Sequence, residues 1–293
     1  MSDVVKRAVP GLFRRLARRG LLPPGALRLR INALETELNR ERHRADQLQQ
    51  RFDAVRVHPI LFTSMPKSGT YFVTSMLGKG LAIQPRIVAN QYFPYDSIRF
   101  FEIQALARDG GISQDHFDAS PLNLTHIGRF FDRVTVMVRD PRQAMLSWIH
   151  FIDGFRDNPE TYLFIYPPLP EAYFDRPLAD RVDWAIEHWL PLLVEWTEGW
   201  LRVADRGGPL KVHIGRYEDM VADQDAFFAA MLDFHAVPRG RFVKPHIPLG
   251  DAVHFRRGET DEWRRVMSPA QQAAAEARIP ESVAARLGWA RSP

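Results

Sequence analysis

The order of apolar and polar residues separates an N-terminal extension from a larger body. Between residues 27 and 55, apolar side chains recur at alternating intervals of four and three, starting at Leu27 and weakened only at Glu41 and Ala45. This spacing places them along one face of a helix and is typical of a coiled coil. A single amphipathic helix packed on its own domain explains the same pattern, so both interpretations stay open. Pro59 ends the pattern.

Beyond residue 58, the pattern predicts buried strands that alternate with helices. Three short apolar runs have the character of strands: 60–63, 134–138 and 210–214. Helices are expected in three places: a segment that ends near Leu77, 141–151 and 180–203. Such alternation predicts an α/β fold with a central, mostly parallel sheet flanked by helices. We therefore divide the chain into a basic arm (1–24), an amphipathic helix (25–57) and a globular domain (58–293).

The composition is that of a folded protein. The 293 residues are 45% hydrophobic and 25% charged, close to the average for globular domains. The absence of cysteine excludes disulfides, thiolate metal sites and thiol nucleophiles. The sequence has no run of 18 apolar residues, and arginines interrupt the apolar residues of the first twenty, so neither a membrane span nor a signal peptide is predicted. We expect a cytoplasmic protein, peripheral to a membrane at most.

The net charge of +4 conceals an uneven distribution. Residues 1–58 hold 13 Lys and Arg against 6 Asp and Glu, whereas the remaining residues hold 26 against 29. The basic surplus therefore belongs to the extension, and the body carries no nucleic-acid-binding signature, so nucleic acid is not an expected partner. We expect the arm to be solvated or to contact an anionic membrane surface, and any homo-oligomer to form through the 27–55 helix.

The most informative stretch is a strand, turn and helix around Lys67. The turn is Pro66-Lys67-Ser68-Gly69-Thr70, entered by a buried strand and left by a helix. Unpaired amides and the helix dipole favour an anion at a helix N-terminus, and Lys67 adds a full positive charge. The turn therefore predicts a phosphate site. Its order differs from the Walker A motif, in which the lysine follows a glycine, so ATP is not indicated.

A second candidate phosphate site follows the strand at 134–138. Arg139 leaves the carboxyl end of this strand, where ligands of open α/β sheets bind. Ser147 lies two helical turns further along, after Asp140-Pro141-Arg142. Because an arginine fork suits phosphate, the chain is predicted to hold a ligand with two phosphate groups.

These segments together resemble a known family. The motifs at 66–70 and 139–147 resemble the 5′- and 3′-phosphate-binding motifs of sulfotransferases that use 3′-phosphoadenosine 5′-phosphosulfate (PAPS). The segments Tyr217-Glu218-Asp219 and Phe255-Arg256-Arg257-Gly258 resemble two further motifs of that family. The four matches occur in the family's order, and the resemblance covers about residues 59 to 290.

The resemblance implies a role for each matched residue. The residues expected to bind PAPS are Lys67, Ser68, Gly69, Thr70, Tyr71, Phe72, Arg139, Ser147, Tyr217, Arg256, Arg257 and Gly258. Lys67 is also expected to be catalytic, because a fixed cation stabilises the negative charge that develops on the departing phosphate. Phe72 and Tyr217 are expected to contact the adenine. The sequence fits a position in the hydrophobic core equally well for Tyr217.

The acceptor hydroxyl needs a general base. Thr125-His126 matches the family's Thr-His segment, whose histidine deprotonates the acceptor, and histidine has a pKa suited to that task. Leu124 stands where the family has a lysine. Glu102 is the alternative base, because some carbohydrate-acting relatives use a carboxylate. No cluster of ligands has metal-binding spacing, so no metal is expected.

The sequence thus predicts an enzyme that transfers a sulfuryl group from PAPS to a hydroxyl of a carbohydrate, a lipid-linked acceptor or a small alcohol or phenol. Aromatic residues that could contact this acceptor are concentrated in 92–101 and 162–174. Two other interpretations stay open. One is a P-loop-type kinase, and the other is a non-catalytic scaffold or binding module on a sulfotransferase fold.

Overall fold

The computed structural model describes residues 34–41, 59–157, 166–247 and 259–289. The chain divides into two compact units, Met1–Arg56 and Val57–Pro293. Within the first unit, residues 34–41 form a helix on which Leu34 and Leu38 are exposed. The basic arm and the rest of the predicted 25–57 helix lie outside the described residues, so the coiled coil stays a prediction.

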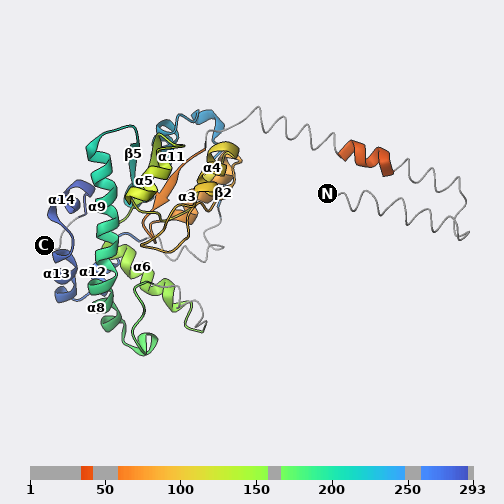
Figure 1. Ribbon diagram of the computed structural model, residues 1–293. Helices are drawn as coiled ribbons and strands as arrows, with labels where there is room; N and C mark the ends of the chain where they lie inside the picture. The colour runs from red at the N-terminus through yellow and green to blue at the C-terminus, as the bar shows by residue number, and fades with distance from the viewer. Residues whose placement is uncertain (1–33, 42–58, 158–165, 248–258, 290–293) are drawn as a thin grey trace, which may run out of the picture. The chain divides into compact units, whose positions relative to one another are not determined.

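A parallel sheet organises the second unit (Figure 1). Strands β1 (Phe62–Ser64), β4 (Arg133–Val138) and β5 (Lys211–Arg216) lie side by side in the order β1-β4-β5, and both pairs are parallel. Strands β2 (Pro85–Arg86) and β3 (Ile112–Ser113) form a second parallel pair. Parallel bridges from Ile60 to Ile112 and from Thr63 to Asp115 place β3 beside β1, on the side away from β4. The predicted α/β fold with a parallel sheet is confirmed.

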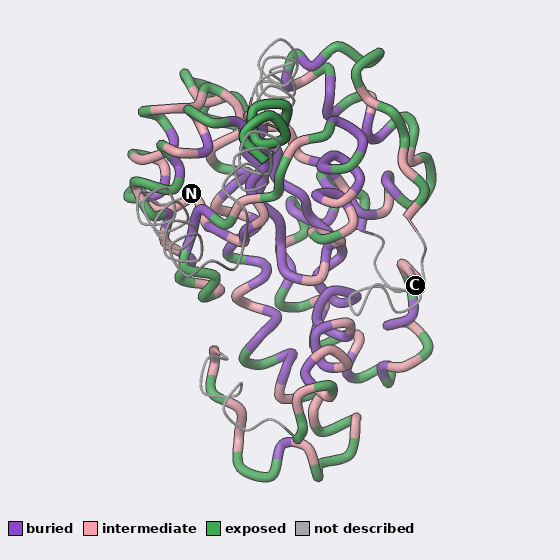
Figure 2. The backbone as a smooth tube through the Cα atoms, turned by 90° about the vertical axis from the view of Figure 1, so that its right-hand side faces the viewer, coloured by how far each residue is buried: buried purple, intermediate pink, exposed green. Residues whose placement is uncertain are grey.

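The strands separate two hydrophobic cores because successive side chains point to opposite faces. Leu61, Val134 and Val136 belong to one core, whereas Phe62 and Met137 belong to the other. All five are fully buried. Burial on both faces explains why these strands appear in the sequence as nearly continuous apolar runs. Figure 2 shows the buried backbone running through the middle of this unit, with exposed segments around it.

Helices cover both faces of the sheet. Residues of α3 (Thr70–Leu81) and α11 (Gln224–Phe234) pack in the core of Phe62, and residues of α6 (Pro141–Asp153) and α9 (Leu190–Arg206) pack in the core of Leu61. The remaining α-helices are α4 (Phe100–Asp109), α5 (Pro121–Ile127), α8 (Leu178–His188), α10 (Tyr217–Ala222), α12 (Trp263–Val266), α13 (Pro269–Ala277) and α14 (Glu281–Leu287). Short 3₁₀ turns occupy Tyr173–Asp175 and Arg239–Arg241.

One predicted helix is wrong. The expected helix over 180–203 is two helices, α8 and α9, that meet at Trp189. Pro191 stands in the first turn of α9, where its missing amide costs nothing, but it would break a continuous helix through the same position. The break places the buried Trp189 against Trp148 of α6, with ring centroids 4.5 Å apart.

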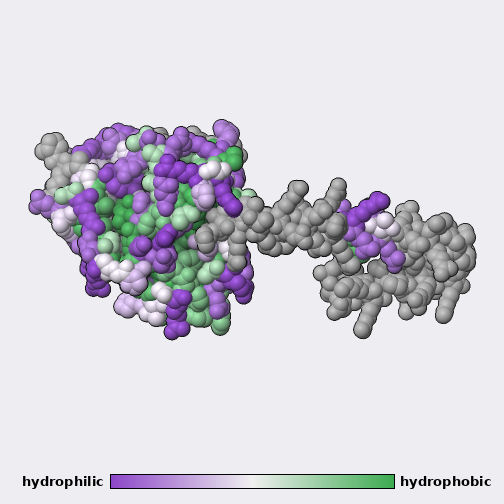
Figure 3. All heavy atoms as spheres, turned by 90° about the horizontal axis from the view of Figure 1, so that it is seen from above, coloured by the Kyte–Doolittle hydropathy of each residue, from purple (hydrophilic) through white to green (hydrophobic). Residues whose placement is uncertain are grey.

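The surface of this unit carries both apolar and hydrophilic residues. Figure 3 shows a face on which apolar residues gather in the middle and hydrophilic residues surround them. Among the residues that the structure describes, no helix is both long and apolar enough to cross a bilayer.

Candidate active site

Four candidate functional residues each follow the carboxyl end of a different strand. Lys67 follows β1, His116 follows β3, Arg139 follows β4 and Tyr217 follows β5. Because these strands are parallel and adjacent, their carboxyl ends meet at one edge of the sheet. Ligands of open α/β sheets bind at this edge. The sheet thus brings together, at one edge, side chains from segments that are far apart in the sequence.

The turn between β1 and α3 has an unusual backbone. Lys67 and Gly69 have positive φ angles of 66° and 90°. A Cβ atom on Gly69 would lie 3.3 Å from the Tyr217 ring, so glycine is required there both for its conformation and for the close approach of Tyr217. No described side chain caps the N-terminus of α3, and the amides of its first turn have no partner within the helix.

Serine and threonine in this turn have different roles. The amide and the hydroxyl of Ser68 both donate to the carbonyl oxygen of Met65, at 3.2 and 2.5 Å, and Ser68 is fully buried. In this structure Ser68 therefore closes the turn, and its contact with phosphate stays a prediction. The Thr70 hydroxyl lies 2.6 Å from the Ser64 hydroxyl at the end of β1.

Tyr71 and Phe72, which follow Thr70, differ in how far they are buried. Tyr71 is 47% exposed. The half-buried ring of Phe72 packs against the second core, with its centroid 6.4 Å from that of Phe228. The Lys67 side chain extends toward α6, where its ammonium nitrogen lies 4.0 Å from the centre of the Phe151 ring.

Arg139 connects three parts of the site. Its guanidinium donates to the carbonyl oxygens of Lys67 at 2.7 Å and of Glu259 at 2.6 Å, and it stacks 4.0 Å from the centre of the Tyr217 ring. The side chain is almost fully buried, and burial lowers its pKa. Its Nε is buried without a hydrogen-bond partner among the described residues. A buried cation with an unused donor suits an anionic ligand.

His116 is held at the end of β1 through one of its ring nitrogens. Its Nδ1 lies 2.7 Å from the carbonyl oxygen of Ser64. A carbonyl only accepts, so the hydrogen is on Nδ1 and the neutral ring presents Nε2 as a base. Burial lowers the pKa of His116 and Lys67 lowers it further, whereas the bond to the Ser64 carbonyl and the charge of Asp96 oppose both. The main-chain oxygen of His116 accepts a bond from the indole of Trp196 on α9.

The histidine predicted from the sequence lies elsewhere. His126 is in the last turn of α5, where its Nδ1 is 3.3 Å from the carbonyl oxygen of Ile98 and its ring packs on Phe100. Glu102 on α4 is half exposed and lies 3.9 Å from Arg99. The described contacts of both residues are with α4 and its start, and the role of either as a base stays a prediction.

The sequence analysis missed His116. Its strand, β3, has two residues, too few to produce a recognisable apolar pattern. The available signal was the buried pair Ile112-Ser113 shortly before a histidine.

The remaining predicted ligands are placed only in part. Ser147 is half-buried on α6, two turns beyond Arg139. Arg256, Arg257 and Gly258 lie outside the described residues. The described residues include no group of three acidic or histidine side chains arranged to hold a metal.

Comparison with known proteins identifies the fold. No protein-family model matches the sequence, and no curated protein matches it. Among solved structures, mouse sulfotransferase SULT7A1, complexed with PAP, superposes with a TM-score of 0.55 and 15% identity, over 80% of this chain and 88% of the mouse chain. The chain has a sulfotransferase fold. Lower scores link it to sulfotransferase domains from the curacin biosynthetic pathway (0.46, 12% identity, 81% of this chain and all of that one) and from the Synechococcus PCC 7002 olefin synthase (0.41, 15% identity, 75% and 94%).

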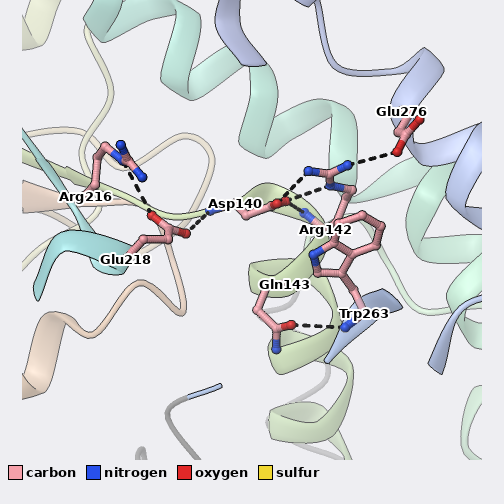
Figure 4. Close-up of polar contacts among 7 residues, drawn as sticks. All are labelled: Asp140, Arg142, Gln143, Arg216, Glu218, Trp263 and Glu276. Atoms are coloured by element: carbon pink, nitrogen blue, oxygen red, sulfur yellow. Dashed lines mark hydrogen bonds and ion pairs between the residues drawn. The ribbon is translucent and has the colours of Figure 1, made fainter. Parts of the chain in front are cut away.

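In this sulfotransferase fold, a network of buried polar side chains connects the residues that follow β4 to α10, α12 and α13 (Figure 4). The Arg142 guanidinium makes a two-pronged bond to Asp140, at 2.9 and 2.7 Å, contacts Glu276 at 3.2 Å and stacks 3.8 Å from the Trp263 ring centre. The Glu218 carboxylate accepts the Asp140 amide at 2.9 Å. The network thereby fixes the backbone that follows Arg139 relative to α10, α12 and α13.

Proposed function

We propose that this protein is a PAPS-dependent sulfotransferase that transfers a sulfuryl group to an acceptor hydroxyl. The observation that carries the proposal is the meeting of Lys67, His116, Arg139 and Tyr217 at the carboxyl ends of four adjacent strands. The sulfotransferase fold supports the same conclusion, because mouse SULT7A1 was solved with PAP, the product nucleotide of such a donor.

The residues around the turn suit a nucleotide with two phosphates. The amides at the start of α3 and the Lys67 ammonium would hold the 5′-phosphate. Arg139, with its buried Nε, and Ser147 would hold the 3′-phosphate, and the Tyr217 ring lies under the Arg139 guanidinium. PAPS supplies an activated sulfuryl group. Lys67 and the amides stabilise the negative charge that its phosphate acquires as the bond to sulfur breaks.

His116 is the general base that the geometry favours. Nε2 takes the proton of the acceptor hydroxyl, the acceptor oxygen forms a bond to sulfur, and the bond between sulfur and the bridging phosphate oxygen breaks. The Ser64 carbonyl holds Nδ1–H throughout, which fixes the orientation and the tautomer of the ring. The lowered pKa keeps the imidazole neutral near pH 7, as a base requires. His126 and Glu102, the bases predicted from the sequence, are the alternatives to His116.

Binding and transfer measurements test the proposed function. Calorimetry with PAP should give a saturable binding curve, whereas ATP with Mg²⁺ should bind at least tenfold more weakly. Transfer of radiolabel from [³⁵S]PAPS should then be screened against sugars, phenols, aliphatic alcohols and lipid-linked hydroxyls. ATP turnover without PAP binding would indicate the kinase instead, and PAP binding without any transfer would indicate the binding module.

Lys67→Ala gives a sharper version of the same test. The variant should lose transfer by at least about 10²-fold, the usual cost of removing one preorganised electrostatic stabiliser. Lys79→Ala is the matched control, since Lys79 is exposed in the last turn of the same helix. Equal activity of the two variants would contradict the assigned chemistry.

A further inference from the structure

A loop between β2 and α4 presents aromatic side chains to solvent. Tyr92 is 37% exposed and Tyr95 is 58% exposed. The Tyr95 ring packs edge-on against Tyr166, with centroids 5.1 Å apart and hydroxyl oxygens 3.4 Å apart. Exposed tyrosines that pack against one another offer both ring faces and hydroxyls to a ligand.

One buried carboxylate joins this loop to His116. Asp96 is fully buried, and its Oδ1 accepts the Gln91 amide at 2.6 Å. Its Oδ2 accepts the His116 amide at 3.0 Å. The Tyr92 amide nearby helps to lower the pKa of this carboxyl group, which burial raises. A single side chain therefore satisfies amides from the loop and from the residue that we assign as the base.

The backbone of Asp96 is fixed as well. Its carbonyl oxygen accepts a bond from the Asn123 side chain at 3.1 Å, and the Asn123 oxygen accepts the Ile98 amide at 2.8 Å. These bonds tie the C-terminal flank of the loop to α5. Moving the loop therefore requires breaking bonds to a buried carboxylate, which is costly in a site that water does not reach.

We propose that Asp96 is a positioning residue that couples an acceptor-contacting loop, residues 91–95, to the base His116. The inference rests on the proposed function, and it names the part of the chain that holds the acceptor hydroxyl near Nε2. Asp96 touches neither reactant. It acts by fixing the loop and the histidine backbone in one geometry, and a well-oriented acceptor contributes strongly to the rate.

The charge of Asp96 gives this role a measurable signature. The carboxylate favours the imidazolium form of His116, whereas Lys67 and burial disfavour it. Asp115, the other buried carboxyl group nearby, accepts the amides of Val88 and Ala89 and holds the start of the same loop. Removing the Asp96 charge should therefore lower the pKa of His116, whereas a loosening of the packing that admits water to the ring would raise it.

Asp96→Asn tests the coupling, because asparagine keeps the shape but turns a donor toward one of the amides. We expect kcat/KM for the best acceptor of the screen to fall about 10-fold to 100-fold. The acid limb of its pH profile should move to lower pH. The same shift should appear in an NMR titration of the His116 ring, which needs no acceptor. The Kd for PAP should stay within twofold, because the described hydrogen bonds of Asp96 are to Gln91, His116 and Asn123.

Two further variants keep the inference falsifiable. Asp118→Asn is the matched control: Asp118 accepts from Asn123 at 2.7 Å and from the Ser120 amide, and its described bonds do not reach His116. It should leave the His116 titration unchanged. Tyr95→Ala changes an exposed residue and should raise KM for the acceptor while leaving that titration alone.

The outcomes separate the inference from the proposed function. An unchanged titration of His116 and an unchanged pH profile in Asp96→Asn would overturn the coupling, and an unchanged acceptor KM in Tyr95→Ala would overturn the role of the loop. The pH profile and the acceptor KM require a wild-type protein that binds PAP and transfers sulfuryl, whereas the titration of His116 does not. If the wild type does neither, the proposed function itself is wrong.

Discussion

The guanidinium of Arg139 donates to the main-chain oxygen of Lys67 across 2.7 Å, so the end of β4 holds the turn that follows β1. This bond restrains Lys67 in its left-handed conformation, φ 66°. A residue that is proposed to bind one phosphate thus also shapes the turn that is proposed to bind the other. Any change at Arg139 should affect both halves of the nucleotide site.

Arg139→Lys should weaken PAP binding although it keeps the charge. Lysine cannot reach both carbonyl oxygens and stack on Tyr217 in the same geometry. The loss of one bond from a charged donor corresponds to about 2 kcal/mol, or roughly 30-fold in Kd. Arg133→Lys is the control, because Arg133 donates to the Phe234 carbonyl at the opposite end of the same strand. Calorimetry with PAP measures both, and equal affinities would argue against a nucleotide site at Arg139.

His116→Asn and His126→Asn distinguish the two candidate bases. The first should reduce the transfer rate by about 10² to 10⁴-fold with little change in PAP affinity, because a positioned base contributes that much. The second should leave the rate within a few-fold, since the described bonds of His126 are with Ile98 and Phe100. Transfer from [³⁵S]PAPS provides the measurement. The reverse ranking of the two variants would restore His126, and full activity in both would direct attention to Glu102.

Buried His235 should make the fold sensitive to acid. Its Nε2 lies 2.9 Å from the Thr135 hydroxyl, and burial, with His213 and Arg133 nearby, lowers its pKa to about 3. An unfolded histidine has a pKa of about 6.5, so below that pH the unfolded chain binds a proton that the folded chain excludes. The contribution of His235 to stability therefore falls as the pH drops from about 6.5 to about 3. His235→Gln should lose less stability over that window.

Urea unfolding at pH 7 and at pH 5 measures this effect. His188→Gln is the control, since His188 is exposed on α8 and should not change the pH dependence. If wild type and His235→Gln lose equal stability between the two pH values, the histidine does not carry the acid sensitivity.

Arg142→Leu should destabilise the protein severely. The substitution leaves the Asp140 and Glu276 carboxylates without their cation, and breaking a buried ion pair from one side costs about 3 to 5 kcal/mol. Arg286→Leu removes an exposed ion pair with Asp205 and should cost at most about 1 kcal/mol. Denaturant unfolding compares the two. A similar loss in both would mean that water reaches the Arg142 network.

The parts of the fold with strong local patterns were predictable from the sequence. The apolar, β-branched run of β4 and the Asp140-Pro141 start of α6 combine a buried strand with a good helix start, so both were predicted nearly to the residue. The turn around Lys67 was predictable because a glycine and several donors before a helix have few other uses. The split at Trp189 was missed because amphipathic spacing continues across it, although Pro191 was a visible signal.

The candidate base was harder to predict because it depends on tertiary contacts. Thr125-His126 matched a local motif, yet the histidine that the sheet brings to the strand ends is His116. Its position is set by the bridge between Thr63 and Asp115, which joins residues 52 positions apart and leaves no periodic trace in the sequence. Local resemblance therefore pointed to a histidine base but could not distinguish between two histidines ten positions apart.

The four candidate site residues follow four different strands, β1, β3, β4 and β5. Ligand binding therefore requires that all four strands are folded and paired. Lys67 and Tyr217 are 150 positions apart, and the strands between them must all be paired before the four residues meet. A fragment that ends before β5 lacks one corner of the site, however well its remaining helices form. Nucleotide affinity should consequently be lost together with the last strand pairing, so a variant that binds with wild-type affinity has assembled the whole sheet, whichever residue it changes.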